Sequence, residues 1–335
     1  MANFGNVIFS KEAYFSSAVF KEYAEFLWAK FTLDAHFVGT AFLKAVNFYQ
    51  AIFHAAVEFR DTKFRKDGES SPGPVFTLTQ FMNPETVFFY KNYLGQALFY
   101  NCDVSRLNFS SVYWRTRTNG KRQLFEECID FEAAGDLSPG PNEPNERDYS
   151  LIAEIYQQLK KNYDSRQDYW TAGDFHYGEM EMKRLHSPRK NKAARWLHRN
   201  LGLVAWYRYA SEYGESYVRP LLALLAVLIL FTVLFPVPGL VFTKPDASTT
   251  PPLFSILSYG DFPAYIHAYK GPAWIGTLAF FGHSLMTALS VAGFQKELIY
   301  QPAYPWGRAL ALLELLLTST LIALFLLALR RQFRR

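Results

Sequence analysis

The closest approach to a metal-binding set in this sequence is made by His176, Glu179, Glu181 and His186. A histidine and an acid three residues apart on a helix can face one ligand. The set contains no HExxH-type spacing, however, and Glu, Lys and His on a solvated helix face are the ordinary source of such a pattern. We therefore favour the solvated face and predict no metal and no other cofactor. No nucleophile or phosphate-binding loop stands out elsewhere, so we predict no enzymatic activity.

Two further titratable residues, Glu314 and His283, fall inside long apolar segments. A carboxylate inside a membrane is costly unless it faces water, protein or a partner, so Glu314 is a functional candidate. Snorkelling or helix packing is the alternative for this side chain. His283 invites a proton-sensing role, but we favour a histidine that packs between helices.

The only cysteines are Cys102 and Cys128. The N-terminal segment, MANFGNVIFSKEAYF, has no basic stretch followed by an apolar core, so we expect the first domain to stay in the cytoplasm. In that reducing compartment a disulfide is not expected, and we predict two buried or idle thiols.

A phenylalanine repeat runs from Phe4 to Phe64, and its steps alternate between five and six residues. Its positions are Phe4, Phe9, Phe15, Phe20, Phe26, Phe31, Phe37, Phe42, Phe48, Phe53, Phe59 and Phe64. A small or β-branched residue stands two positions before each phenylalanine. Positions two apart lie about 200° apart on a helix but share one face of a strand. The pattern predicts stacked short strands with an interior ladder of rings, and a helical domain with aromatic stripes is the alternative.

Segments such as AEFLWAKF (residues 24–31) and VNFYQAIF (residues 46–53) resemble the Ala-x-Phe repeats of pentapeptide-repeat proteins. The resemblance implies a right-handed quadrilateral β-helix over residues 1–134. The ladder is interrupted by KDGESSPGP and then resumes less regularly, with Cys102 at a core position. The later ladder residues are Phe89, Leu94, Phe99, Val104 and Phe109, and Phe125 and Phe131 are expected to close the stack.

Acidic and basic residues balance one another up to Phe64. A neutral surface is a poor copy of a polyanion and is not a basic footprint for nucleic acid. We therefore predict no nucleic-acid partner. The repeat is expected to act as a scaffold, a sensor or a surface for a cytoplasmic protein partner.

A helical connector is expected after a linker at residues 135–148, which is rich in Pro, Gly, Asn and Asp. An apolar stripe from Leu151 to Tyr163 and a second helix from about Tyr169 predict a helical hairpin. The phrase DFHYGEMEMKR resembles the connector of pentapeptide-repeat proteins fused to channel domains. Basic and aromatic residues then alternate from Lys183 to Arg219, which predicts an interfacial helix with its cations toward anionic headgroups. Nucleic-acid binding is the alternative, and the adjacent membrane span argues against it.

Three apolar segments follow. Residues 221–242 and 309–329 are each long enough to cross a bilayer, and Pro236 and Pro238 are expected to bend or end the first. The last is followed by RRQFRR, a cytoplasmic anchor. Because the basic connector and the basic tail both belong inside, the number of crossings should be even. We therefore interpret residues 273–294 as a re-entrant helix and expect both termini in the cytoplasm, at the inner membrane of a bacterium.

SLMTALSVAGFQ (residues 284–295) resembles the pore helix and filter of the potassium-channel superfamily, and residues 308–331 resemble the inner helix of its bacterial members. The resemblance covers about residues 216–331 and implies a pore helix that ends at residues 287–289. It also implies that the protein forms a homotetramer and that this homotetramer binds ions. The implied pore and filter residues are Thr287, Ser290, Val291, Ala292, Gly293, Phe294 and Gln295. A potassium filter needs a Thr-Val-Gly-Tyr-Gly run, which is missing here, so potassium selectivity is in doubt.

The sequence thus predicts four parts: a β-helix at 1–134, a linker at 135–148, a hairpin and basic connector at 149–215, and a transmembrane pore-like domain at 216–335. The leading hypothesis is an oligomeric, ion-channel-like protein of the lipid bilayer whose cytoplasmic repeat senses a signal or organises assembly. The alternative is a membrane-tethered scaffold with a degenerate pore domain that does not conduct.

Overall fold

A computed structural model describes residues 1–65, 73–128, 147–187, 191–242, 256–269, 271–295 and 300–334. The chain forms two compact units, Met1–Ala205 and Trp206–Arg334. The predicted ladder residue Phe131 and residues 135–146 of the predicted linker lie outside the described residues.

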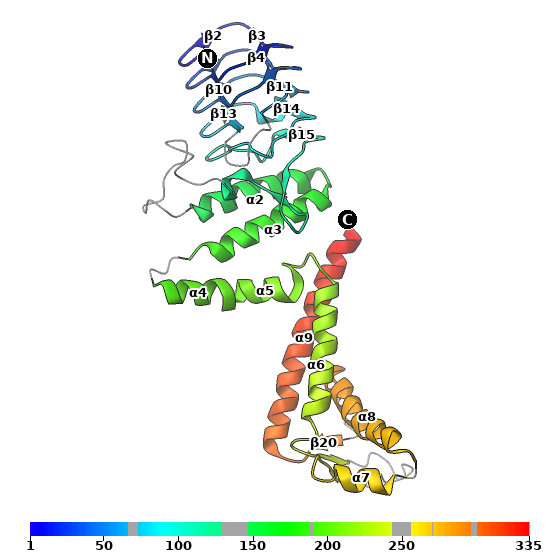
Figure 1. Cartoon of the computed structure of the whole chain (residues 1–335). Coiled ribbons are helices and arrows are strands. Elements are labelled where there is room, and N and C mark those ends of the chain that lie inside the picture. The colour runs from blue at the N-terminus through cyan, green and yellow to red at the C-terminus, as the bar shows by residue number, and fades with distance from the viewer. Residues whose placement is uncertain are drawn as a thin grey trace. The chain divides into compact units, whose positions relative to one another are not determined.

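The first unit begins with short parallel strands stacked in successive coils (Figure 1). Ala2 pairs with Ala24 and Ala24 pairs with Val46, so one coil of the early repeat takes 22 residues. The first stack contains β1 (Ala2–Asn3), β5 (Ala24–Glu25), β9 (Val46–Asn47) and β12 (Pro74–Val75). The second contains β2 (Ile8–Phe9), β6 (Lys30–Phe31), β10 (Ile52–Phe53) and β13 (Gln80–Phe81). The third contains β3 (Ala13–Tyr14), β7 (Ala35–His36), β11 (Val57–Arg60), β14 (Val87–Tyr90) and β15 (Asn108–Ser110), and the fourth contains β4 (Val19–Phe20) and β8 (Ala41–Phe42).

The phenylalanines form the core of this stack, as the repeat predicts. Phe26 lies parallel to Phe4 at 4.9 Å and to Phe48 at 5.0 Å, measured between ring centroids. The preceding small residue, for example Ala24, is buried on the same interior face and leaves space for the rings. The predicted stacked strands are confirmed, and the alternative of a helical domain is wrong for this part of the chain.

The alternation of five and six residues has a backbone cause. Each five-residue step passes through one residue with a left-handed φ, and each six-residue step turns without one. The left-handed corners recur every eleven residues, at Asn6, Ser17, Trp28, Gly39, Gln50 and Asp61, with φ between 52° and 66°. The shorter step needs the tighter corner, and at Gly39 the missing Cβ makes that conformation free of steric cost.

A helical hairpin closes the last described coil. Its helices are α2 (Tyr149–Ser165), capped by Asp148, and α3 (Tyr169–Leu185), capped by Asp168. The amide of Asn162 donates to the carbonyls of Val104 at 2.9 Å and Leu107 at 2.7 Å, which satisfies backbone groups that the next coil would otherwise pair. The predicted hairpin is confirmed. The smaller elements before it are η1 (Pro84–Thr86), β16 (Arg115–Thr116), β17 (Arg122–Gln123) and η2 (Phe125–Glu127).

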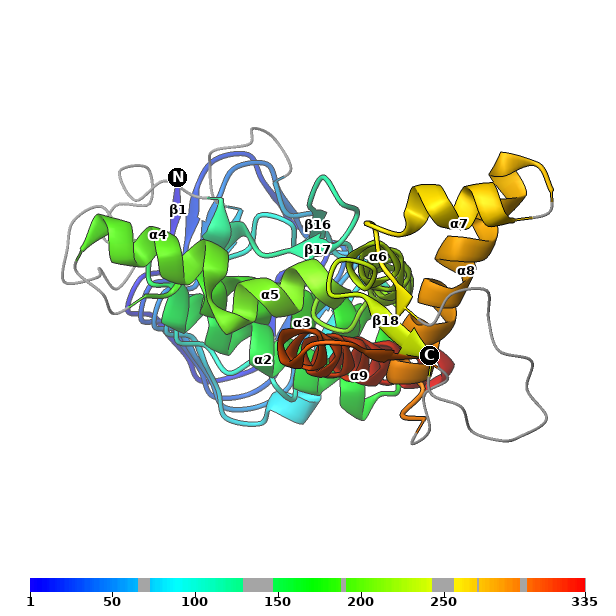
Figure 2. The same ribbon diagram turned by 90° about the horizontal axis from the view of Figure 1, so that it is seen from below.

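Two short helices, α4 (Lys192–Leu201) and α5 (Leu203–Ser211), complete the connector. The second unit then contains three apolar helices and a small sheet. Its elements are α6 (Val218–Leu234), β18 (Leu240–Phe242), β19 (Ile256–Leu257), α7 (Phe262–Ala268), α8 (Ala273–Ala292), β20 (Tyr300–Pro302) and α9 (Pro305–Arg334). Figure 2 looks close to along α6 and shows α7 and α8 on one side of the α6–α9 pair.

The first predicted span is shorter than expected. Helix α6 has 17 residues, about 25 Å at 1.5 Å per residue, and residues 240–242 of the predicted span form strand β18. Pro236 and Pro238 lack the N–H groups that would continue the helix, so the predicted end at these prolines is confirmed and the predicted extent to residue 242 is wrong.

Candidate functional site

The segment between α6 and α9 begins and ends in one antiparallel sheet. Strand β18, which follows α6, pairs with β20, which precedes α9, in the register Val241 to Gln301. Strand β19 pairs with the other edge of β18 and leads into α7 and α8. The chain therefore leaves this sheet at Leu257 and returns to it at Tyr300, with α7 and α8 between.

Helix α8 is inclined to α6 and α9 (Figure 1). It has 20 residues, about 30 Å, and only six residues lie between Gly293 and Tyr300 of the sheet, so these two residues are at most about 25 Å apart. Its first half is anchored by rings, since Phe280 is buried against Phe262 of α7 at 4.9 Å and Tyr265 at 5.6 Å. Within the described residues, α8 and α9 are the two helices long and apolar enough to cross a membrane.

The implied filter residues lie at the C-terminal end of α8. The helix continues through Ala292, so the predicted end of the pore helix at residues 287–289 is wrong by about one turn. Thr287 is buried and its hydroxyl donates to the carbonyl of His283 at 3.0 Å. Ser290, Val291 and Ala292 are helical, Gly293 is the C-cap, and Phe294 has a left-handed φ of 56° and an exposed ring.

The carbonyls of this helix end are already engaged. The N–H of Gly293 donates to Leu289 at 2.9 Å, that of Phe294 to Val291 at 3.2 Å, and that of Gln295 to Ser290 at 3.0 Å. A filter of the potassium type coordinates ions with successive carbonyls that point into the pore. In this conformation the carbonyls of Leu289, Ser290 and Val291 close the helix instead.

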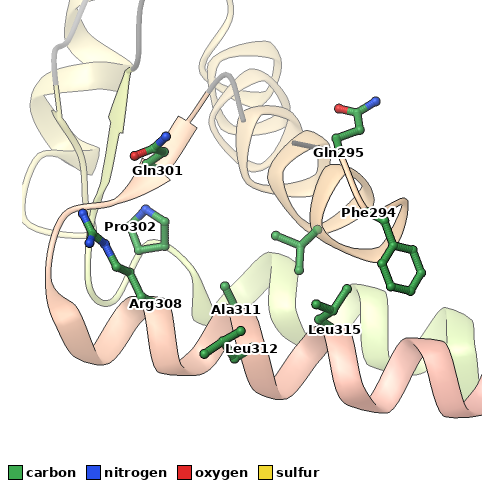
Figure 3. A pocket seen from close by; sticks show the side chains of 9 residues that line it. Phe294, Gln295, Gln301, Pro302, Arg308, Ala311, Leu312 and Leu315 are labelled. Carbon is green, nitrogen blue, oxygen red and sulfur yellow. The ribbon is translucent and has the colours of Figure 1, made fainter. Parts of the chain in front are cut away.

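A cavity of about 520 Å³ lies between the end of α8, strand β20 and the first turns of α9 (Figure 3). Its floor is apolar and includes Leu312 and Leu315, while Arg308, Gln295 and Gln301 bring polar groups to it. Of the implied filter residues, Val291, Phe294 and Gln295 line this cavity together with the start of the implied inner helix, which the sequence order alone does not require.

Glu314 is buried on α9, and neither of its carboxylate oxygens has a hydrogen-bond partner among the described residues. Its own backbone carbonyl accepts from Thr318 at 2.9 Å. A buried polar group without a partner is costly, so this carboxylate calls for an explanation beyond packing. His283 lies with its ring 5.1 Å from that of Tyr300, which links α8 to the sheet as a packing histidine would.

Comparisons with family models, with curated proteins and with solved structures found no match for this chain.

Of the residues that came closest to a metal-binding set, Glu179 and Glu181 are buried, so the predicted solvated face is wrong for them, and both form ion pairs. Glu179 lies 3.2 Å from the Lys160 ammonium, 2.5 Å from Lys183 and 3.6 Å from His176. Burial opposes its charge, but the nearby His176, the hydrogen bond from Lys183 and the charge of Lys160 together lower the pKa of Glu179 to about 2. Across the described part of the chain no three His, Cys, Asp or Glu residues are grouped as a metal site.

A buried polar network joins the last coil to the hairpin. Glu127 accepts from Arg117, from the Tyr156 hydroxyl and from Gln123, and the Tyr156 hydroxyl in turn accepts from the N–H of Leu124 at 2.9 Å. Sequence reasoning missed this network because its hydrogen-bonded partners are 4 to 39 residues apart and follow no period.

Beside this network Glu126 is fully buried and accepts from the N–H of Phe99 at 2.6 Å. Burial raises the pKa of Glu126 to about 7, and the charge of Glu127 acts in the same direction. Cys102 is buried, as predicted, and burial also raises the pKa of its thiol, as it does for the half-buried Cys128. Both cysteines are free.

Proposed function

We propose that the second unit is a pore-forming membrane domain in which α6 and α9 cross the bilayer and α8 enters and leaves from one side. The observation that carries this proposal is the β18–β19–β20 sheet, which holds both ends of the intervening segment at the junction of α6 and α9. A crossing helix would deliver the chain to the opposite side, whereas the chain is again part of the sheet at Tyr300, soon after α8 ends at Ala292.

The aromatic residues support the same placement. Tyr304 and Trp306, which follow β20, are exposed, and so are Trp274 at the start of α8 and Tyr217 just before α6. Tryptophan and tyrosine are enriched at the two membrane–water interfaces, so these residues mark the two ends of the crossing helices. Arg330 and Arg331, in the last turns of α9, then lie at the same end as the start of α6, on the cytoplasmic side in this proposal.

The pore itself requires several copies, because a single pair of crossing helices encloses no channel. In this proposal four copies associate as a homotetramer in the inner membrane, with Gly293, Phe294 and Gln295 of each copy at the narrowest part and Glu314 as an intramembrane acid. The exposed side chains of Leu312 and Leu316 on α9 are available for contacts between copies or with lipid.

The first unit is, in this proposal, a right-handed quadrilateral β-helix of the pentapeptide-repeat type. Its four stacks and its 22-residue coil support this assignment. The hairpin transmits a signal from the β-helix, or organises the assembly, and the surface of the coils binds a cytoplasmic protein. Ion pairs between neighbouring coils, such as Lys44 with Glu22 at 2.5 Å, leave that surface close to neutral.

A second function is favoured by one specific observation. The carbonyls of Leu289, Ser290 and Val291 are occupied by the hydrogen bonds that end α8. Such a pore domain would not conduct, and the protein would then be a membrane-tethered scaffold.

Reconstitution separates the two functions. The purified oligomer, with its mass measured in detergent, is placed in planar bilayers. Discrete conductance that changes in Gly293→Ala and Phe294→Ala supports the pore, with Glu154→Gln on the exposed side of α2 as the control variant. No conductance from a verified oligomer, together with a cellular phenotype that depends on the coils and not on Gly293, supports the scaffold.

A further inference from the structure

Helix α4 exposes its apolar side chains instead of burying them. Trp196, Leu197 and Leu201 are 62%, 49% and 52% exposed, and no residue of α4 is buried. The cations Arg195 and Arg199 are only half-exposed. A helix that covers a soluble core has the opposite arrangement, with its apolar stripe toward the protein.

The orientation of α4 is fixed by a pair of arginines. Arg184 of α3 donates to the carbonyl of Arg199 at 2.9 Å, and the Nε of Arg199 donates to the carbonyl of Leu185 at 2.9 Å. The guanidinium of Arg199 also lies 5.7 Å from the ring of Tyr149 on α2. This charge therefore holds α4 against the hairpin, and the apolar face is turned away from it.

The residues before and after α4 in the sequence restrict what can cover its apolar face. No Asp or Glu occurs between Arg184 and Ser211, so two such segments brought together would place cations against cations. Exposed apolar residues continue along the chain in Leu203, Trp206 and Tyr209, and α6 begins at Val218. A surface of tryptophan, tyrosine and leucine with basic neighbours matches the boundary between lipid headgroups and acyl chains.

We propose that the outward face of α4, formed by Trp196, Leu197 and Leu201, lies in that boundary and docks the first unit on the bilayer. The inference rests on the proposed membrane insertion of the second unit but not on conduction. The sequence predicted a helix with its cations toward anionic headgroups. In this proposal the apolar side chains of α4 make the membrane contact instead, and Arg199 does not reach the headgroups. Docking by this face therefore needs no anionic lipid.

Nitroxide labels test this contact in the full chain reconstituted in phosphatidylcholine vesicles, in a Cys128→Ser background. Labels are placed at Leu197→Cys and Leu201→Cys, with Gln157→Cys on the exposed side of α2 as the matched control. We expect high collision with oxygen and low collision with a water-soluble nickel chelate at residues 197 and 201, and the reverse at residue 157. The oxygen-to-nickel ratio should differ several-fold.

Three results would overturn the proposal. High nickel collision at both α4 positions would place the face in water, and low collision with both reagents would show that protein covers it. A high oxygen-to-nickel ratio that appears only when phosphatidylglycerol is added would show that α4 binds the membrane through attraction between its cations and anionic lipid. A label at Leu316→Cys in the same vesicles reports whether α9 is inserted, so failure of the proposed membrane domain is distinguished from failure of α4 docking.

Discussion

Arg331, near the end of α9, donates a hydrogen bond to the backbone carbonyl of Tyr213, five residues before α6 begins, at 2.8 Å. The same guanidinium lies 3.4 Å from the carboxylate of Glu215. The β18–β20 pairing joins the end of α6 to the start of α9, and the Arg331 contact joins the end of α9 to the chain just before α6. The two helices are therefore antiparallel neighbours. The chain that enters α6 and the chain that leaves α9 are therefore at the same end of the pair.

This pairing predicts the sidedness of the membrane domain. Gln332→Cys and Gln157→Cys should react with an impermeant maleimide only in inside-out vesicles, and Tyr304→Cys only in right-side-out vesicles. Each variant is made in the Cys128→Ser background. Labelling of residue 332 from outside, with residue 157 inside, would mean an odd number of crossings and would refute the proposed topology.

Phe88 and Phe89 offer a matched test of the ring ladder. Phe89 is fully buried and stacks on Phe59 at 4.8 Å and on Phe109 at 5.3 Å, while the adjacent Phe88 points outward and is 41% exposed. We expect Phe89→Ala to destabilise the coils by about 3–5 kcal/mol, because it leaves a cavity in the stack. Phe88→Ala should cost less than about 1 kcal/mol. Amide hydrogen exchange at residues 57–60 in the full chain measures both, and equal costs would contradict the ladder as the source of stability.

The elements that could be predicted from the sequence are those whose cause is local. The phenylalanine period determines the strands, and two prolines end α6. The pairing of Val241 with Gln301 could not be predicted, because neither strand has more than three residues and nothing periodic connects them. The pore helix was expected to end at residues 287–289, but Ser290, Val291 and Ala292 continue the helix for about one more turn. Residues such as these are compatible with either state, and tertiary contacts decide between them.

Glu126 should make the coil–hairpin junction sensitive to pH. The folded-state pKa of about 7 lies above the ordinary value of 4.5, so the folded state binds the proton more tightly than the unfolded state does. Its stabilising contribution is complete below about pH 4.5 and is lost as the pH rises through about 7, with a total on the order of 3 kcal/mol.

The amide of Phe99, which donates to Glu126, is the natural reporter. After correction for intrinsic exchange, its protection should fall between pH 5 and pH 7, and Glu126→Gln should remove that dependence, because the amide carries no titratable proton. Glu154→Gln on the exposed side of α2 should leave the profile as it is. The same fall in the Glu126→Gln variant would assign the pH dependence to another group.

Replacing the carboxylate of Glu314 should change the stability of the protein and its ion flux in opposite directions. Its buried oxygens have no partner among the described residues, so Glu314→Leu removes an unsatisfied polar group and should raise stability in detergent by about 1–3 kcal/mol. If the carboxylate takes part in ion permeation, Glu314→Leu should also lower ion flux in liposomes. Glu314→Gln should have a stability and an ion flux between those of the parent protein and of Glu314→Leu. Ser319→Ala, at a partly exposed position of the same helix, should alter neither quantity. A variant that gains stability and conducts as well as the parent would show that the carboxylate has no part in the pore.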